Sequence, residues 1–404
     1  MRIHFMVTKD LLRGGGIEKY TREVGRRLVQ RGHEVTAFAT GGTGPRPNSW
    51  NGMDIVWLPK GRPYWSEKLA GAAMATVREF RMDRPDVVHL HSVAAGSMAA
   101  ALRWRGSPCL VQMHGVEWQR SRWSSFARLT LRALEAATFR CGHAFTAVSN
   151  VQCRYYEQRY SVPVEFIPTA AGLAEPADPS LLAPLGVAPG RYVFSASRLV
   201  PEKGIHYLIQ AFRHVRTDWK LVVGGAAGGA GGYARALREM AAGDSRILFT
   251  GHVEGELLQA LFGNAGAYAQ PSEMEGLAMS LIEAMGHGVL CIASDIPENR
   301  EALGTAGVLF RSRDPRDLAD KLDWAVKNPS RGSMLGVKAR RRVADLYTWD
   351  RVTAALEDLY QRTILQFGQR GSAGNRPSGA PAAGAAQPGH AGVLNAPQVR
   401  SNPQ

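Results

Sequence analysis

The stretch PSEMEGLAMSLIEAMGHGVLCIASDIPEN, residues 271–299, places two glutamates in different local settings. Glu275 lies in a turn rich in Pro, Ser and Gly, and Glu283 lies within an apolar run, 277–285, that predicts a helix. The start of a helix carries unpaired N–H groups and partial positive charge, so this turn is suited to a diphosphate. Gly276 would let the backbone approach a ligand closely while Glu275 reaches a sugar hydroxyl. Taken alone, the stretch fits an ordinary capped helix with a solvated glutamate equally well.

Apolar runs of strand length alternate with helical periods through the first part of the chain. A strand at 2–8 is followed by a glycine-containing loop and a helix at about 17–31. Further strands are expected at 34–39, 54–58, 86–90, 109–113, 143–148 and 164–168, with helices near 65–82, 92–105, 123–141 and 149–159. This alternation is typical of a parallel, doubly wound sheet.

The same alternation returns after residues 169–190, which are rich in Ala, Pro and Gly and predict a linker. Strands are expected at 192–196, 220–224, 246–250, 266–270, 289–293 and 306–310, and helices at about 204–216, 232–242, 254–263, 278–287 and 296–303. A chain of 404 residues also exceeds what one hydrophobic core usually supports. We therefore predict an α/β fold of two Rossmann-like, doubly wound domains, residues 1–168 and 191–349, facing each other across a cleft.

The end of the chain changes character twice. Residues 350–367 read as one more helix. From 368 to 404 the sequence turns to Gly, Ala, Pro, Gln and Ser without acidic residues. Such a composition cannot bury enough apolar surface to fold, so this segment is predicted to be a disordered tail.

The central stretch resembles the donor-site signature of the family-4 glycosyltransferases of GT-B fold, whose paired glutamates (E-x7-E) correspond to Glu275 and Glu283. That family also carries an Arg at the end of the first strand of its C-terminal domain and a Lys five residues later, matched by Arg198 and Lys203. Its glycine-rich turn after the first strand is matched by residues 14–16. The resemblance implies GT-B architecture, a last helix that crosses back to the first domain, and sugar transfer with retention of anomeric configuration.

The resemblance also implies a role for each matched position. Glu275 would bind donor-sugar hydroxyls, Glu283 the ribose, and the two cations the diphosphate. The expected donor-binding residues are Gly15, Gly16, Arg198, Lys203, Glu275, Gly276, Leu277, Ala278 and Glu283. Leu277 and Ala278 depart from the usual aromatic and glycine, which puts the donor contacts in question. As purely structural residues, Arg198 or Lys203 would instead pair with Glu202 or another surface acid.

His114 directly follows the strand expected at 109–113, and ligands gather at the carboxyl ends of parallel strands. The family commonly holds a His there near the transferred sugar, so we expect His114 to orient the sugar and to join Glu275, Arg198 and Lys203 as catalytic residues. The alternative is a structural histidine at a strand end. His89 and His91 share a strand face, but no third metal ligand lies nearby in sequence. With no D-x-D pair either, we expect neither a metal nor a cofactor.

A net charge of +14 favours anionic partners, which could be nucleotide sugars, nucleic acid or an anionic membrane face. The stretch 118–140 is rich in arginine, contains one glutamate and has Trp118, Trp123 and Phe126 near its start. Such a helix can lie on anionic lipid, although the simpler interpretation is a sheet-covering helix with solvated arginines. No module of interleaved aromatic and basic residues is evident, so nucleic acid is not an expected partner.

Compartment signals are few. The four cysteines show no metal-ligand spacing and are expected to be reduced core thiols. The opening residues are too short and too polar for a signal peptide, and no run approaches the ~18 apolar residues of a spanning helix. We therefore expect a cytoplasmic protein, with the inner face of the cell membrane as a candidate location.

Together these features predict a metal-independent hexosyl- or deoxyhexosyltransferase. It would move a sugar from a nucleotide sugar to a glycan or lipid-linked acceptor, and the resemblance is closest to bacterial enzymes that build surface or exopolysaccharides. Two alternatives stay open: a nucleotide-sugar epimerase of similar fold, which converts the donor without an acceptor, and a non-catalytic protein that binds the donor without turnover. Glu275→Ala and Lys203→Ala are expected to abolish transfer and leave the melting temperature nearly unchanged.

Overall fold

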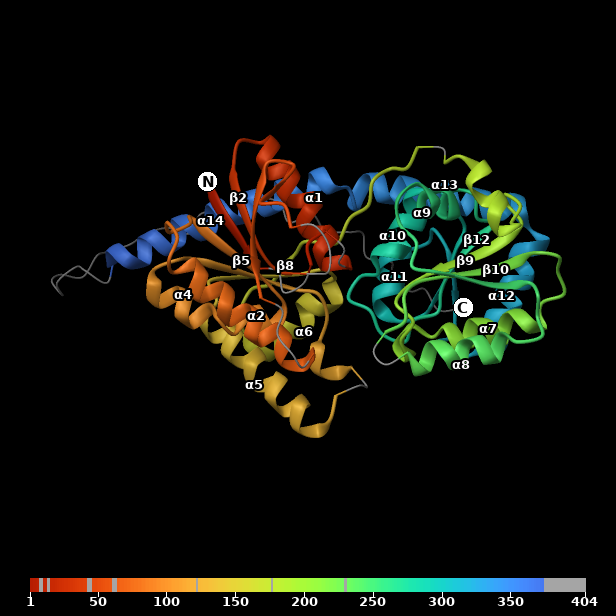
Figure 1. Ribbon diagram of the computed structural model, residues 1–404, viewed down its shortest axis with the longest axis horizontal. Coiled ribbons are helices and arrows are strands. Elements are labelled where there is room, and N and C mark those ends of the chain that lie inside the picture. The colour runs from red at the N-terminus through yellow and green to blue at the C-terminus, as the bar shows by residue number, and fades with distance from the viewer. Residues whose placement is uncertain are drawn as a thin grey trace, which may run out of the picture.

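The computed structural model describes residues 1–6, 10–12, 15–41, 46–59, 64–120, 123–175, 177–228 and 231–373. Two open sheets lie side by side, one in each half of the chain (Figure 1). The first has the order β3-β4-β2-β1-β5-β6-β7-β8, and all its neighbours are parallel except β3 with β4. Its strands are β1 (Arg2–Met6), β2 (Glu34–Thr40), β3 (Ser49–Trp50), β4 (Met53–Leu58), β5 (Val87–His91), β6 (Cys109–Met113), β7 (Ala144–Ala147) and β8 (Glu165–Phe166).

Helices cover both faces of the first sheet because side chains of its buried strands alternate between two apolar layers. On β1, Phe5 packs with helix α1 (Gly16–Gln30), and the next residue, Met6, belongs to the opposite layer. That opposite layer is closed by α2 (Tyr64–Glu79), α3 (Ser92–Gly96), α4 (Ala99–Arg105), α5 (Ser125–Cys141) and α6 (Asn150–Tyr160). Figure 1 shows these two helical layers above and below the strands.

The second sheet is wholly parallel, in the order β11-β10-β9-β12-β13-β14. Its strands are β9 (Tyr192–Ala196), β10 (Lys220–Gly224), β11 (Ile247–Gly251), β12 (Ala267–Gln270), β13 (Cys291–Ser294) and β14 (Val308–Phe310). One face is covered by α7 (Ile205–His214), α8 (Gly232–Ala241) and α12 (Pro315–Lys327), and the other by α9 (Gly255–Gly263), α10 (Met279–Gly286) and α13 (Pro329–Leu346). The helix α11 (Pro297–Leu303) follows β13. The two-domain α/β architecture is therefore the predicted one.

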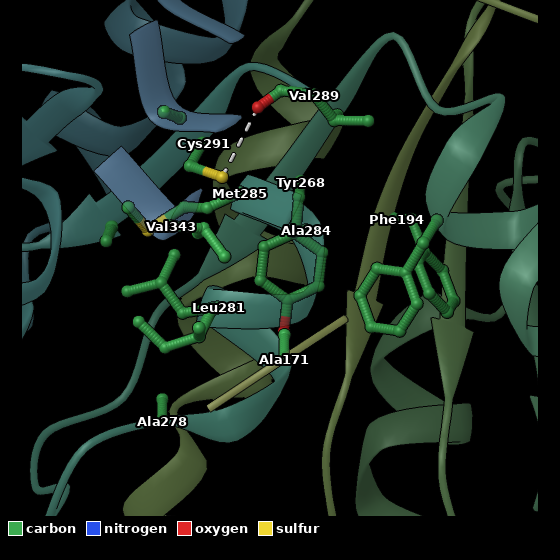
Figure 2. Close-up of a cluster of buried hydrophobic side chains, with 14 of the residues drawn as sticks. Ala171, Phe194, Tyr268, Ala278, Leu281, Ala284, Met285, Val289, Cys291 and Val343 are labelled. Atoms are coloured by element: carbon green, nitrogen blue, oxygen red, sulfur yellow. Dashed lines mark hydrogen bonds between the residues drawn. The ribbon is translucent and has the colours of Figure 1, made fainter. Parts of the chain in front are cut away.

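The core beneath α10 fixes the position of the central stretch. Leu281 and Met285 of α10 are fully buried against Tyr268 of β12 and Val343 of α13 (Figure 2). Each such side chain contributes roughly 1.5–3 kcal/mol by leaving water. Because α10 is held by apolar contacts along its inner face, its first residues are presented at the carboxyl edge of the sheet. All four cysteines are free, and Cys291 lies inside this core.

The last helix, α14 (Trp349–Ala373), packs on the first domain. Arg27 of α1 donates to Asp350 at 2.9 Å, and Arg362 makes two bonds of 2.6 and 2.8 Å to Glu165 of β8. The Tyr360 hydroxyl also lies 2.6 Å from Nδ1 of the buried His89. The helix continues to residue 373, beyond the predicted start of the tail at 368, and residues 374–404 of that tail lie outside the described residues.

Three local expectations were wrong. The helices α12 and α13 were not predicted, the expected helix 92–105 is divided into α3 and α4, and the linker contains a 3₁₀ helix, η2 (Pro179–Leu185), with Leu182 fully buried. In α13, glycines that weaken helix propensity are needed for packing, since a Cβ on Gly336 would lie 1.9 Å from the carbonyl oxygen of Gly288. No described helix is long and apolar enough to cross a bilayer.

Candidate functional site

The candidate site lies where the strand order of the second sheet reverses direction. The strand β9 has β10 on one side and β12 on the other, and the connections that leave β9 and β12 depart from the same carboxyl edge. In open α/β sheets such a reversal leaves a crevice in which ligands bind. Arg198 and Lys203 follow β9, and Glu275 follows β12, so the structure brings these three predicted residues to one edge.

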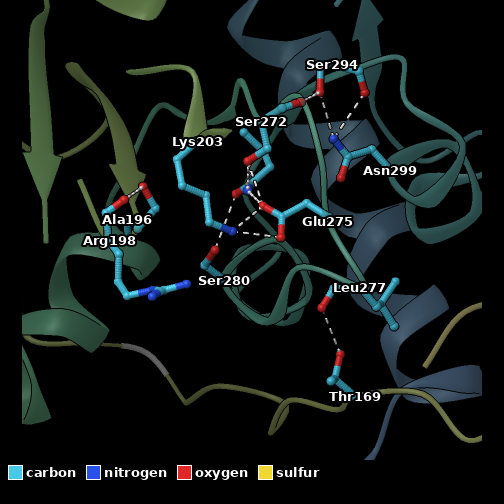
Figure 3. A network of polar contacts seen from close by, with 12 residues as sticks. Thr169, Ala196, Arg198, Lys203, Ser272, Glu275, Leu277, Ser280, Ser294 and Asn299 are labelled. Carbon is cyan, nitrogen blue, oxygen red and sulfur yellow. Dashed lines mark hydrogen bonds and ion pairs between the residues drawn. The ribbon is translucent and has the colours of Figure 1, made fainter. Parts of the chain in front are cut away.

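Lys203 and Glu275 form a well-shielded ion pair at this edge (Figure 3). The Lys203 Nζ lies 2.6 Å from Oε1 and 2.7 Å from Oε2 of Glu275. The side chains are only 18% and 7% exposed. Two further donors fix the same carboxylate: Gln270 Nε2 at 2.8 Å and Ser272 Oγ at 2.6 Å, both to Oε1. Glu275 is therefore held in one orientation by three neighbours.

The two loops that carry this pair are pressed together by backbone contacts. Gly204, at φ +66°, follows the short 3₁₀ helix η3 (Pro201–Lys203), and a Cβ there would lie 2.0 Å from the carbonyl oxygen of Pro271. The Glu273 N–H also donates to the Glu202 carbonyl oxygen at 2.9 Å. Only glycine fits this left-handed, crowded position, so Gly204 is what allows Lys203 to reach Glu275.

Lys203 thus pairs with an acid of the site itself rather than with Glu202. Because the Lys203–Glu275 pair is nearly buried, variants that remove one partner are expected to be less stable. Removing one partner of a buried pair costs roughly 3–5 kcal/mol, because the other charge is left without compensation. In contrast to the expectation from sequence, Lys203→Ala and Glu275→Ala should therefore each lower the melting temperature.

Arg198 differs from Lys203 in having no fixed partner. It is exposed, and within the described part of the chain its guanidinium makes no hydrogen bond or ion pair. In Figure 3 its side chain extends toward the turn that carries Glu275, as that of Lys203 does. One paired and one unpaired cation therefore face the same turn.

The start of α10 offers backbone donors rather than side chains. Leu277 and Ala278 are 6% and 5% exposed, and both side chains belong to the core. Among the described residues, nothing accepts a hydrogen bond from their backbone N–H groups, while the Leu277 carbonyl oxygen accepts from Thr169 at 3.4 Å. Leu277 and Ala278, which stand in place of the usual aromatic and glycine, therefore keep their side chains in the core. Their backbone N–H groups at the helix start are left available to an anion.

The first domain meets this turn directly. A Cβ on Gly276 would lie 2.2 Å from the carbonyl oxygen of His114, so the backbones of the two domains touch at this point. Gly16, at the start of α1, would place a Cβ 3.9 Å from the Met279 methyl group of α10. Gly15 is exposed and precedes α1, and Gly14 lies outside the described residues. Gly276 therefore allows the two domains to touch, and its contact with a ligand stays a prediction.

His114 is positioned by a buried histidine, His91. Their ring nitrogens, Nε2 of His114 and Nδ1 of His91, lie 3.0 Å apart. The Thr21 hydroxyl donates to the Ile17 carbonyl oxygen, so its oxygen accepts from His91 Nε2 at 3.1 Å. Burial holds the pKa of His91 well below its usual value, so the ring is neutral. His91 Nδ1 is then an acceptor, and His114 Nε2 is the donor.

His89, His91 and His114 lie close together and could be considered as metal ligands. The His89 ring is tilted against that of His91, with ring centroids 4.4 Å apart, and burial lowers the pKa of His89 to about 3. His114 thus supplies the third histidine that was absent from the neighbouring sequence. Even so, the described residues contain no group of three or more His, Cys, Asp or Glu side chains arranged to hold a metal ion.

Glu283, the second glutamate of the predicted pair, also contacts the first domain. Its carboxylate forms an ion pair with Lys19 of α1, and the Glu283 side chain is 13% exposed. Lys19 could not be identified from sequence, because nothing along the chain indicates that α1 faces α10. Any ligand of Glu283 must share this carboxylate with Lys19 or displace it.

A second carboxylate joins the domains at a helix start. Glu301 of α11 accepts from the Asn150 N–H at 2.8 Å, from the Asn150 amide at 2.9 Å and from the Val151 N–H at 3.2 Å. These groups form the beginning of α6, where N–H groups lack partners within the helix and negative charge is favoured. Glu301 therefore stabilises the approach of the two domains.

Glu301→Ala is expected to favour a more open arrangement of the domains. Hydrogen bonds to a charged group are worth about 1.5–3 kcal/mol, so the ratio of closed to open molecules should fall by roughly 10- to 100-fold. Small-angle X-ray scattering would detect this as a larger radius of gyration. Glu239→Ala, which removes an exposed carboxylate of α8, is the matched control. An unchanged scattering profile for Glu301→Ala would contradict the assigned role.

Each half of the chain matches a family of glycosyltransferases. Residues 14–174 match the family described as Glycosyltransferase Family 4, and residues 187–342 match the one described as Glycosyl transferases group 1. The chain is 26% identical to the D-inositol 3-phosphate glycosyltransferase of Xylanimonas cellulosilytica, over 86% of this chain and 91% of that protein. It is 25% identical to the GDP-mannose-dependent alpha-(1-6)-phosphatidylinositol monomannoside mannosyltransferase of Mycolicibacterium smegmatis, over 88% and 97%.

Solved structures share the fold along nearly the whole chain. Sucrose-phosphate synthase from Thermosynechococcus elongatus superposes with a TM-score of 0.80 at 21% identity, covering 91% of this chain and 100% of that one. Anabaena Alr3699/HepE in complex with UDP-glucose gives a TM-score of 0.75 at 18% identity, covering 90% and 100%. Both halves of the chain and their arrangement point to one family: the protein is a family-4 glycosyltransferase of GT-B fold.

Proposed function

We propose that the protein transfers a glycosyl group from a nucleotide sugar to a glycan or lipid-linked acceptor in surface polysaccharide synthesis, with retention of configuration and without a metal. The observation that carries the proposal is the meeting of Arg198, Lys203, Glu275 and the start of α10 at the reversal of strand order. The related HepE structure contains UDP-glucose, which supports a nucleoside-diphosphate sugar as donor. A lipid-linked acceptor would place the enzyme at the inner face of the cell membrane.

The chemistry follows from where charge develops. As the glycosidic bond to phosphate breaks, negative charge grows on the departing diphosphate, and fixed cations lower the energy of that state. Arg198 and Lys203 would supply positive charge, and the N–H groups of Leu277 and Ala278 would add donors from the helix start. Glu275 would accept from sugar hydroxyls, and Glu283 would hold the ribose after sharing or releasing Lys19. His114 would contact the sugar from the first domain, and the leaving phosphate would take the acceptor proton.

The proposal is tested by measuring nucleoside-diphosphate release. Nucleotide sugars are first screened for thermal stabilisation, and those that bind are then incubated with candidate glycan and lipid-linked acceptors. We expect acceptor-dependent release that persists in EDTA and a product with the donor's anomeric configuration by NMR. Conversion of the donor without acceptor would favour an epimerase. Binding of donors without turnover by any acceptor would favour a non-catalytic protein.

His91→Phe is expected to lower kcat by about 100-fold with little change in donor affinity, because a misplacement of about 1 Å at the reacting groups can have an effect of this size. The reason is that His114 loses the acceptor that fixes its ring. Nucleoside-diphosphate release and thermal shift with donor would measure the two effects. His143→Phe is the control, since His143 accepts from the Cys109 N–H at the opposite edge of the sheet. Full activity of His91→Phe would show that His114 needs no such support.

A further inference from the structure

The first turns of α5 expose large apolar side chains next to arginines. Phe126 is 80% exposed and Leu129 is 66% exposed, and their spacing of three positions puts them on one side of the helix. The inner side of α5 is committed to the core through Thr138 and Phe139. Solvated arginines alone would explain a charged outer face, but they do not explain why Phe126 and Leu129 are left in water beside them.

A hollow lies beside Leu129. It has a volume of about 490 Å³ and is lined by Trp118, Gln119, Ser125, Arg128, Leu129 and Arg132. The Arg132 guanidinium lies over the Trp118 ring, 4.0 Å from its centroid, in a cation–π arrangement that holds this arginine at the wall of the hollow. An arginine fork held in this way is preorganised for phosphate oxygens.

The charge on this surface has one sign. The exposed charged residues of α5 are all arginines: Arg128, Arg132 and Arg140. Its single acid, Glu135, is fully buried and accepts from the Tyr160 hydroxyl at 2.7 Å, so it neutralises none of them at the surface. Apolar side chains beside such a field are complementary to an interface that is anionic at its surface and apolar below it.

We propose that α5 and the adjoining 3₁₀ helix η1 (Glu117–Gln119) dock the protein on a bilayer with anionic phospholipid headgroups. Arg128 and Arg132 receive headgroup phosphates at the hollow, and Phe126 and Leu129 enter the boundary with the acyl chains. Only four positions separate Trp118 at the hollow from His114, whose carbonyl group meets the turn of the second domain. The bilayer surface is thereby brought near the contact between the domains, where a lipid-linked acceptor would bind. Delivery of the acceptor in this way rests on the proposed function, whereas the docking itself does not.

Co-sedimentation of the full-length protein with vesicles tests the docking without donor or acceptor. We expect binding to vesicles of phosphatidylcholine with phosphatidylglycerol, weaker binding at high salt, and little binding to phosphatidylcholine alone. Arg128→Gln with Arg132→Gln should weaken binding by about 5-fold for each arginine. Phe126→Ala with Leu129→Ala should weaken it by at least about 10-fold. These side chains are exposed, so unchanged thermal unfolding would verify that the variants fold.

The matched control is Met334→Ala with Lys338→Gln, which removes an exposed Met and a nearby Lys from α13 of the other domain. This variant should bind vesicles within about 2-fold of the unaltered protein if docking is specific to α5. The proposal is overturned if the unaltered protein does not sediment with anionic vesicles, or if both α5 variants bind as well as it does. Vesicle binding without nucleoside-diphosphate release would refute the proposed function and leave the docking surface standing.

Discussion

Replacing Lys203 with alanine is expected to lower sugar transfer by about 10²- to 10³-fold, the effect of removing one preorganised group that stabilises developing charge. It should also lower the free energy of unfolding by roughly 3–5 kcal/mol, because Glu275 would be left charged and nearly buried. Both effects arise from one contact, in which Lys203 Nζ lies 2.6 and 2.7 Å from the two oxygens of Glu275. Nucleoside-diphosphate release and urea denaturation would measure them separately.

A double variant, Lys203→Met with Glu275→Gln, separates the structural from the chemical role. It removes both charges and nearly preserves shape, so much of the stability lost in Lys203→Ala should return. Gln270 and Ser272 can still donate to an amide oxygen at position 275. Activity should stay low, because neither the cation for the diphosphate nor the carboxylate for the sugar is present. Recovery of transfer along with stability would mean that the pair is only structural.

The fold was predictable from sequence because parallel strands are buried on both faces and therefore appear as short, continuous apolar runs. The run around β9 is an example, and it is followed by α7, whose apolar residues Leu208, Ile209 and Phe212 are buried on one side. The failure to predict α13 has a physical cause. Gly332 and Gly336 make α13 a poor helix by propensity, yet tertiary packing against the loop after α10 requires them.

The candidate site was predictable only as far as residues lie at strand ends. The positions of Arg198 and Glu275 after neighbouring strands were enough to expect them at one edge. Their assigned roles stay predictions. Contacts between domains left no trace in the sequence: Lys19 and Glu301 lie far along the chain from Glu283 and Asn150. Gln270 could have been suspected, since it ends β12 just before the turn that carries Glu275.

Arg198→Ala is the variant that should lose activity without losing stability. Its guanidinium is exposed and makes no hydrogen bond or ion pair with the described residues, so the free energy of unfolding should change by less than about 0.5 kcal/mol. If it binds the departing diphosphate, transfer should fall by about 10²- to 10³-fold. Thermal stabilisation by nucleotide sugars should shrink as well, since an arginine fork would contact the donor before reaction.

Two comparisons make the Arg198 result decisive. Arg235→Ala removes an exposed arginine of α8 whose guanidinium likewise makes no hydrogen bond or ion pair with the described residues, and it should leave transfer unchanged. Arg198→Lys keeps the charge but loses the fork that can hold two oxygens, so it should recover only part of the rate. Because Lys203 is already engaged by Glu275 while Arg198 is not, the two cations are not equivalent. Near-full transfer by Arg198→Ala would contradict a role for Arg198 in binding the diphosphate. Lys203 and the start of α10 would then be the remaining candidates for that role.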